Sequence, residues 1–225
     1  MINWQRVKAL CFDVDGTLSD TDDLYVQRAA RVLRLFRFAL SGRDPQKVAR
    51  QLVMLAETPG NALYQFADQI GADNWFSNIA ARFARNTPHK PKSGFLLIPG
   101  VDGLLRSLHG RYPMAVVSAR GRSSTLAFLR QYDLEKYFTA IATGRTCRYT
   151  KPYPDPVLWA AEQMGTAPED CLMIGDTVVD IQAGRAAGAQ TVGVLCGFGE
   201  LSELQAAGAN VILPSTANLS EFLSV

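Results

Sequence analysis

Five short runs of apolar residues constrain the fold of this chain more than any other feature. Each run is continuous rather than alternating, which is typical of a strand buried on both faces of a parallel sheet. The runs are Ala9–Phe12, Met114–Val117, Ala140–Thr143, Leu172–Ile174 and Thr191–Leu195. Because helical patterns separate the later runs over short loops, the sequence predicts an α/β fold with a largely parallel sheet.

Three helices between these runs are bounded by their start and stop signals. Ser, Thr and Asp side chains cap the first turn of a helix, proline fits within that turn, and glycine often follows the last turn. The signals are Ser123 or Ser124 as the cap of a helix that runs to about Tyr132, Asp155 as the cap ahead of Pro156, and Thr177 as the cap of a helix that stops at Gly188. Each predicted helix joins two successive strands, as a parallel sheet requires.

The stretch from about Asp20 to Arg85 differs from the rest, because it has helical periodicity and no convincing strand pattern. Its apolar residues recur one turn apart on one face, and arginines fall on another, which we interpret as a solvated helix face. Prolines and glycines then break the pattern. The sequence therefore predicts a discontinuous α/β core, residues 1–18 and 96–225, with an all-helical cap, residues 19–95, inserted after the first strand.

The charge balance and the cysteines limit the partners that we expect. The chain has 23 basic and 21 acidic residues, too even a balance to indicate nucleic-acid binding through charge alone. No apolar run approaches the roughly 18 residues of a membrane span. The four cysteines are widely spaced, which favours a reducing compartment. We expect a cytoplasmic protein with no nucleic-acid or membrane partner, whose anionic ligand is small, and no pattern indicates its oligomeric state.

Reactive side chains follow four of the predicted strands at their carboxyl ends, where open α/β sheets bind ligands. They are Asp13 and Asp15 after the first strand, Ser118 with the amide of Ala119 after the second, Lys151 in the loop after the third, and Asp176 with Asp180 after the fourth. Clustered carboxylates repel one another unless a cation lies between them, and an all-oxygen ligand set suits Mg²⁺. A metal, a lysine and a hydroxyl are what a transferring phosphoryl group requires.

Each of these residues alone also has a purely structural interpretation. A single polar residue at a strand end can mark the limit of burial. Asp180 can pair with Thr177 in a capping box, and Lys151 can be a solvated lysine whose place is taken by an arginine nearby. The nearby arginines are Arg120, Arg145 and Arg148. It is the combination of groups that indicates chemistry.

Four motifs in order resemble those of the haloacid dehalogenase superfamily, in particular its phosphatases with an inserted helical cap. The motifs are Asp13-Val14-Asp15-Gly16-Thr17-Leu18, Ser118, Lys151 followed by Pro152, and Gly175-Asp176 with Asp180 one helical turn later. The resemblance covers nearly the whole core and implies a Rossmann-like parallel sheet. The segment from Gly197 to Ile212 is similar to phosphoglycolate phosphatase relatives.

The resemblance implies a Mg²⁺-dependent phosphoric monoester hydrolase that forms an aspartyl-phosphate. Asp13 would be the nucleophile, and Asp15 would protonate the leaving alkoxide and then take a proton from the attacking water. The metal ligands would be Asp13, the backbone carbonyl of Asp15, Asp176 and, directly or through a water, Asp180. The phosphoryl oxygens would be bound by Ser118, the Ala119 amide and Lys151.

Two other functions fit the same residues. A phosphomutase of the β-phosphoglucomutase kind uses the same intermediate and a similar cap, and a non-catalytic scaffold would use the cap as a binding surface. The clustered carboxylates argue against the scaffold, because an idle site gains nothing from them. For a hydrolase, phosphoglycolate is the first substrate expected, with pyrophosphate, a sugar phosphate and a nucleotide monophosphate as alternatives. Arg120 is a candidate second cation for the phosphate or for the rest of the substrate.

Overall fold

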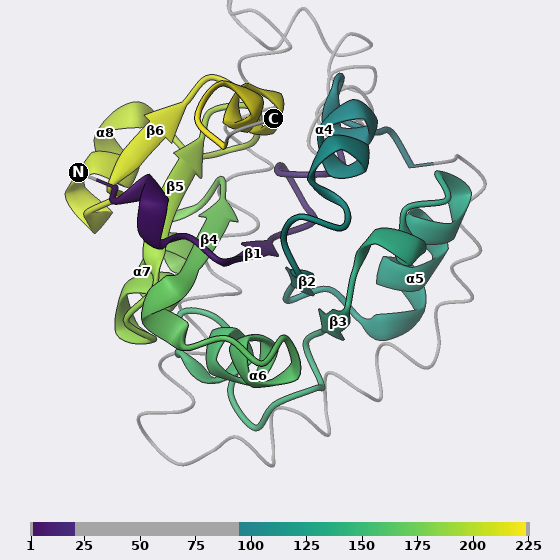
Figure 1. Cartoon of the computed structure of the whole chain (residues 1–225), viewed down its shortest axis with the longest axis horizontal. Helices are drawn as coiled ribbons and strands as arrows, with labels where there is room; N and C mark the ends of the chain where they lie inside the picture. The colour runs from purple at the N-terminus through teal and green to yellow at the C-terminus, as the bar shows by residue number, and fades with distance from the viewer. Residues whose placement is uncertain (1, 21–94, 224–225) are drawn as a thin grey trace, which may run out of the picture. The chain divides into compact units, whose positions relative to one another are not determined.

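A parallel β-sheet forms the centre of the computed structural model, which describes residues 2–20 and 95–223 (Figure 1). In this part of the chain the sheet has six strands, in the order β3-β2-β1-β4-β5-β6. The strands are β1 (Ala9–Phe12), β2 (Met114–Val117), β3 (Ala140–Ala142), β4 (Cys171–Gly175), β5 (Gln190–Val194) and β6 (Val211–Leu213). Every neighbouring pair is parallel. The predicted α/β fold with a Rossmann-like parallel sheet is therefore confirmed.

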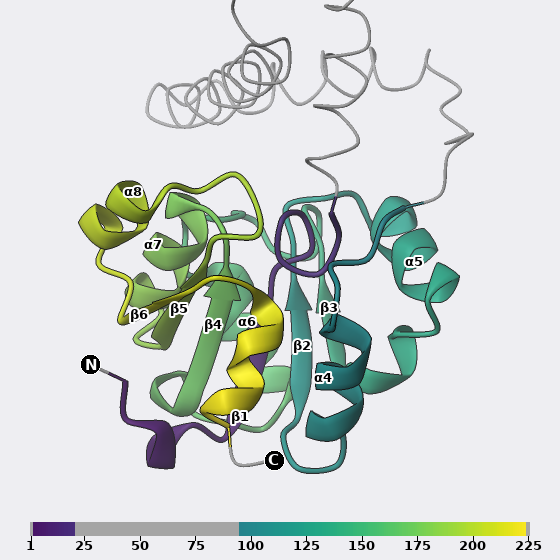
Figure 2. The ribbon, with the colours of Figure 1, turned by 90° about the horizontal axis from the view of Figure 1, so that it is seen from above.

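Alternate side chains of each strand enter two different apolar layers, because successive strand residues point to opposite faces. Leu10 and Phe12 of β1 pack in the layer under α4 (Val101–Leu108), α5 (Arg122–Gln131) and the C-terminal 3-10 helix (Thr216–Glu221). Ala9 and Cys11 pack in the layer under α6 (Asp155–Gln163) and α7 (Val178–Ala186). Figures 1 and 2 show α4 and the C-terminal 3-10 helix on one side of the sheet and α6 on the other.

The shorter elements complete this part of the chain. They are α8 (Leu201–Ala207) and the 3-10 helices Trp4–Arg6, Glu135–Tyr137 and Pro168–Asp170. Trp4 stacks on Phe222, with 5.1 Å between the ring centroids, so the two ends of the described chain pack together. No helix among residues 2–20 and 95–223 has the length and apolar content needed to cross a membrane.

The predicted strands agree with the structure to within one residue at each end. β1 and β2 have the predicted bounds, whereas β3, β4 and β5 begin or end one residue away from them. The strand β6 was not predicted. It has three residues, and only Leu213 among them is buried, so it lacks the fully apolar run of an interior strand.

The three predicted helices are present, but two begin elsewhere than predicted. Thr177 caps α7 in a capping box with Asp180, which confirms the structural interpretation of Asp180. The predicted serine cap of α5 is wrong, because extended Gly121 is the N-cap and its carbonyl accepts the amide hydrogens of Ser124 and Thr125. Asp155 is the first residue of α6 rather than its cap, which is Pro154.

The predicted helical cap falls almost entirely on residues outside the described ranges, as do the arginines of its solvated face. The described residues on either side of it are hydrogen-bonded to each other. The amide of Asp20 donates to the carbonyl of Leu96 at 2.9 Å, and the amide of Ile98 donates to the carbonyl of Leu18 at 3.0 Å. The chain therefore leaves the core and returns to it at adjacent positions.

Candidate active site at the carboxyl ends of the strands

The strand order brings the predicted site residues to one edge of the sheet. β1 lies between β2 and β4, so Asp13, Ser118 and Asp176 follow three adjacent parallel strands. The amide of Asp13 donates to the carbonyl of Ile174 at 2.9 Å, which extends the β1–β4 pairing by one residue. Chain reversal on the two sides of β1 makes this edge the expected place for a ligand site in an open α/β sheet.

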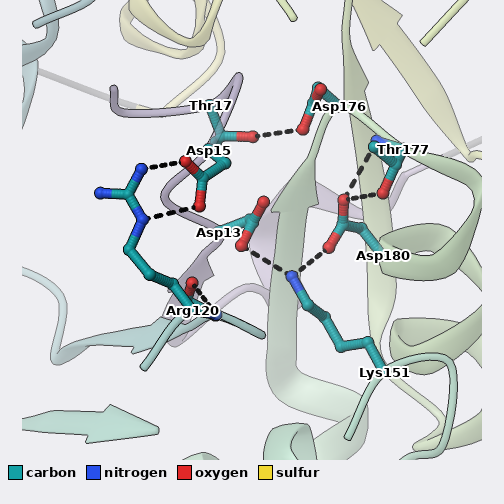
Figure 3. A network of polar contacts seen from close by, with 9 residues as sticks. Asp13, Asp15, Thr17, Arg120, Lys151, Asp176, Thr177 and Asp180 are labelled. Atoms are coloured by element: carbon teal, nitrogen blue, oxygen red, sulfur yellow. Dashed lines mark hydrogen bonds and ion pairs between the residues drawn. The ribbon is translucent and has the colours of Figure 1, made fainter. Parts of the chain in front are cut away.

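Lys151 joins two of the predicted carboxylates. Its ammonium group donates to Asp13 Oδ1 at 2.7 Å and to Asp180 Oδ1 at 2.5 Å. The side chain is 3% exposed, and the carboxylates of Asp13 and Asp180 are 8% and 0% exposed. Lys151 lies in the loop between β3 and α6. Figure 3 shows its ammonium group between the carboxylates of Asp13 and Asp180. The solvated-lysine interpretation of Lys151 is therefore wrong.

Burial and charge act in opposite directions on this pair. Burial, together with the charges of Asp180 and Asp15, raises the pKa of Asp13 to about 7, against the attraction of Lys151, which lowers it. Burial disfavours the charged form of Lys151, but the charges of Asp13 and Asp180 outweigh it and raise the pKa of the ammonium group. A further cation beside Asp13 would favour its ionised form, because an opposite charge lowers the pKa of a carboxyl group.

The second oxygen of Asp180 is held by the start of α7. Asp180 Oδ2 accepts the backbone amide of Thr177 at 3.0 Å and its hydroxyl at 2.6 Å. The capping box and the lysine contact thus use different oxygens of one carboxylate. Asp180 consequently has both roles considered from the sequence, a structural one at the helix start and one in the charged cluster.

Asp176 is fully buried and enclosed by the backbone of two loops. Its carboxylate accepts the hydroxyl of Thr17 at 3.3 Å and the amide of Phe198 at 2.9 Å. A Cβ atom at Gly16 would lie 2.2 Å from Asp176 Oδ2, and one at Gly197 would lie 2.1 Å from the same atom. Glycine is needed at both positions, because any side chain there would displace the carboxylate.

Asp15 faces an arginine that follows the neighbouring strand. Arg120 Nε donates to Asp15 Oδ2 at 3.0 Å, and a second guanidinium nitrogen donates to Asp15 Oδ1. Arg120, a candidate cation for the substrate on sequence grounds, binds Asp15 in the structure. Ser118 is buried and its hydroxyl oxygen accepts the Arg120 amide at 3.1 Å, whereas Ala119 beside it is exposed.

The donor set fits a small divalent cation. Asp13, Asp176 and Asp180 are buried and each offers one carboxylate oxygen, and these oxygens lie within 4.8 Å of one another. Buried carboxylates this close repel one another, and a cation among them offsets the repulsion. An oxygen-only ligand set is the kind that Mg²⁺ prefers, with retained waters completing its coordination.

Two contacts of this site had no counterpart in the sequence analysis. Thr17 belongs to the first motif, but nothing there indicated its bond to Asp176. The amide of Phe198 reaches Asp176 from the loop after β5. The sequence signal for that contact is the pair Gly197 and Gly199 on either side of Phe198, since glycines often mark a close approach of backbone to another group.

Comparison with known proteins identifies the family. The model of the haloacid dehalogenase-like hydrolases matches residues 10–194. Phosphoglycolate phosphatase of Nitrosococcus oceani is 30% identical over 232 residues, covering 98% of both chains. Phosphoglycolate phosphatase of Escherichia coli K12 is 26% identical over 241 residues, covering 97% of this chain and 93% of that one.

A solved structure agrees with the sequence comparisons. The crystal structure of a haloacid dehalogenase-like hydrolase from Bacteroides fragilis superposes with a TM-score of 0.71 at 25% identity, covering 95% of this chain and 99% of that one. The chain therefore belongs to the haloacid dehalogenase-like hydrolases. Within that family its class of enzyme is the one expected from the motifs, a phosphoric monoester hydrolase.

Proposed function

We propose that this enzyme hydrolyses a small phosphorylated metabolite, in the first instance phosphoglycolate, in a Mg²⁺-dependent reaction through an aspartyl-phosphate. The observation that carries the proposal is the buried cluster in which Lys151 bonds Asp13 and Asp180 beside Asp176. The names of the relatives support phosphoglycolate as the substrate. Four free cysteines support the cytoplasm as its location, because disulfides are rare there.

Asp13 is the proposed nucleophile. One of its carboxylate oxygens attacks phosphorus, a bond forms between that oxygen and phosphorus, and the bond from phosphorus to the ester oxygen breaks. The electron pair of that bond goes to the departing alkoxide, which takes a proton from the carboxyl group of Asp15. Asp13 lies at the end of the central strand β1, and Lys151 is hydrogen-bonded to it. This position supports the role of Asp13 as nucleophile, because the attacking group is held rigidly.

Water completes the reaction in a second step. It attacks phosphorus of the aspartyl-phosphate, gives its proton to Asp15, and releases phosphate with the carboxylate of Asp13 restored. Asp15 therefore acts as a general acid in the first step and as a general base in the second, and its carboxyl group regains the proton that it gave up. A carboxyl two residues after the nucleophile, 38% exposed in the side chain, is accessible to both the leaving alcohol and the water.

The remaining residues bind charge. Lys151, the Ser118 hydroxyl and the Ala119 amide are the proposed ligands of the phosphoryl oxygens. The proposed metal ligands are Asp13, the backbone carbonyl of Asp15, Asp176 and Asp180. When bound, Mg²⁺ would lower the repulsion between a carboxylate nucleophile and a phosphate dianion. For Asp180 the three contacts to Lys151 and Thr177 favour a positioning role or a contact through water.

The test is phosphate release from phosphoglycolate, a sugar phosphate, a nucleotide monophosphate and pyrophosphate, with Mg²⁺ and with a chelator. Asp13→Asn nearly preserves shape and removes the nucleophile, so we expect turnover to disappear. Asp133→Asn is the matched control, because Asp133 is 81% exposed and has a φ of 55°, which asparagine also tolerates. Conversion of a sugar phosphate to its isomer without phosphate release would instead indicate a mutase, and no turnover by folded protein would favour the scaffold.

A further inference from the structure

The bond between Arg120 and Asp15 has the geometry of a two-pronged guanidinium–carboxylate pair (Figure 3). Two guanidinium nitrogens donate to the two different oxygens of the carboxylate. The Arg120 side chain is 11% exposed and that of Asp15 is 38% exposed. Such paired bonds fix the plane of the carboxylate as well as its distance, which a single donor does not.

Arg120 is itself held on several sides. Its guanidinium carbon lies 5.2 Å from the centroid of the Phe95 ring, where the aromatic face attracts a cation. Its backbone amide donates to Ser118 Oγ at 3.1 Å, and its carbonyl accepts the Gly144 amide at 3.0 Å. Gly144 is packed so closely that a Cβ atom there would lie 2.4 Å from the Ala119 carbonyl oxygen. The loops after β2 and β3 thus form one rigid support for the guanidinium group.

We propose that Arg120 is a positioning residue, which aims the carboxyl group of Asp15 for its proton transfers to and from the substrate oxygen. The inference rests on the proposed function, because it assumes that Asp15 is the proton donor and acceptor. Asp15 is the most exposed of the site carboxylates, so the surrounding packing limits its orientation less than it limits that of Asp13, Asp176 and Asp180. A proton donor must lie within hydrogen-bond reach of the departing oxygen, so its orientation limits the rate.

The two nitrogens allow Asp15 to keep one contact throughout the reaction. While Asp15 holds its proton, one oxygen can still accept from Arg120 as the other carries the O–H toward the leaving alkoxide. In the structure both oxygens accept from Arg120, an arrangement that uses both oxygens of a carboxylate. A lysine has a single point of charge and does not hold a carboxylate plane in this way.

The inference predicts a dependence on the leaving group. An alkyl phosphate such as phosphoglycolate or ethyl phosphate releases a strongly basic alkoxide that needs a proton, whereas p-nitrophenyl phosphate releases a stable phenolate that does not. The value of kcat/KM reports the first transfer, in which the leaving group departs. A general acid typically raises the reaction rate by about 10²- to 10⁴-fold, and part of this increase is lost when its carboxyl group is misoriented.

The experiment compares kcat/KM of wild type, Arg120→Gln and Arg120→Lys on these three esters with Mg²⁺. For Arg120→Gln we expect a fall of about 10- to 100-fold on both alkyl esters, little change on the nitrophenyl ester, and at most partial rescue in Arg120→Lys. Arg122→Gln is the matched control, because Arg122 is an exposed arginine two residues away. Thermal unfolding of each variant establishes that it is folded. If Arg120→Gln does not fold, the comparison is made with Arg120→Lys.

A double variant tests whether Arg120 acts through Asp15. In the background of Asp15→Asn, Arg120→Gln should change kcat/KM on the alkyl esters little further, because residues that act as one unit are not additive. An equal fall on all three esters would assign Arg120 to the phosphoryl group, and a fall on phosphoglycolate alone would assign it to the substrate carboxylate. Either result overturns the inference while the proposed function stands. Absence of hydrolysis in the wild type would overturn both.

Discussion

Lys151 Nζ lies 2.7 Å from Asp13 Oδ1, and both groups are almost fully buried. The lysine comes from the loop before α6 and the aspartate from the end of β1, so the contact joins segments 138 residues apart in the chain. Buried charges are tolerated when they are paired and hydrogen-bonded. The proposed nucleophile is therefore held in place by an ion pair whose loss leaves Asp13 and Asp180 facing each other.

Replacing that lysine should destabilise the enzyme in the absence of metal. Removing one partner of a buried ion pair costs about 3–5 kcal/mol of unfolding free energy, because the other charge stays buried. We expect Lys151→Met to unfold at lower urea concentration than wild type in a chelator, and Mg²⁺ to restore part of the loss by binding the folded state. Lys8→Met is the control, since Lys8 is 67% exposed and pairs with Asp170 at the surface.

Equal stability of Lys151→Met and wild type in the chelator would contradict this account. It would mean that the carboxylates take up protons at no net penalty once the lysine is gone. The control should change by at most about 1 kcal/mol, the range measured for exposed ion pairs.

Crowding Asp176 should weaken metal binding. An alanine Cβ at position 197 would lie 2.1 Å from Asp176 Oδ2, closer than any contact allows, so Gly197→Ala must displace the carboxylate. Changes beside a metal ligand typically cost about 10- to 100-fold in metal affinity. We expect the Mg²⁺ concentration for half-maximal activity to rise by that order, and calorimetric titration to show the same change.

The control for this prediction is Gly103→Ala, at a position where a new Cβ atom meets no atom within 4 Å. Its Mg²⁺ requirement should equal that of wild type. If Gly197→Ala also kept the wild-type requirement while remaining folded, Asp176 would not be a metal ligand.

Much of the core was predictable because its strands are buried on both faces. In β1 and β2 the apolar run and the strand have the same bounds, since a polar residue, Asp13 or Ser118, follows the last strand residue. The edge strand β6 was missed because a short, half-buried strand leaves no such run. Apolar patterning reports burial, and it fails where burial is partial.

For the candidate site, the sequence indicated which residues gather at one edge of the sheet, but not which contacts they make. The order of the motifs placed Asp13 and Asp176 at one edge, but it did not indicate which carboxylate each cation would bond. Arg120 and Asp15 are 105 residues apart, and they meet only because β1 and β2 are neighbours. The amide of Phe198 acts through the backbone, which any residue type supplies, so its role leaves little trace in the sequence.

The surface cluster of Asp170 gives a pH-dependent contribution to stability. Hydrogen bonds from Lys8 and Arg6 lower the pKa of Asp170 below its ordinary value. A group with a lowered pKa stabilises the fold above its unfolded pKa, about 3.9 for aspartate, and loses this effect as pH falls through the folded value. We expect Asp170→Asn to be less stable than wild type at neutral pH and the difference to shrink on acidification.

Urea unfolding of both proteins across the acidic range tests this expectation. Glu169→Gln is the control, because Glu169 is 53% exposed and lies 3.7 Å from Arg6, a looser contact. A difference between wild type and Asp170→Asn that stayed constant down to the lowest pH would show that the carboxylate charge contributes nothing there.

Two helical glycines should respond in opposite directions to alanine. Gly103 in α4 is exposed, and a Cβ atom there meets nothing within 4 Å, whereas at Gly184 in α7 it would lie 2.7 Å from Thr191 Cγ2 and 2.8 Å from Met173 Cβ. Gly103→Ala should raise the unfolding free energy by about 0.5–1 kcal/mol, because alanine loses less backbone entropy. Gly184→Ala should lower it by about 1–3 kcal/mol, because α7 must move away from β4 and β5. Urea unfolding measures both, and stabilisation by both substitutions would mean that α7 packs less tightly on the sheet than these distances require.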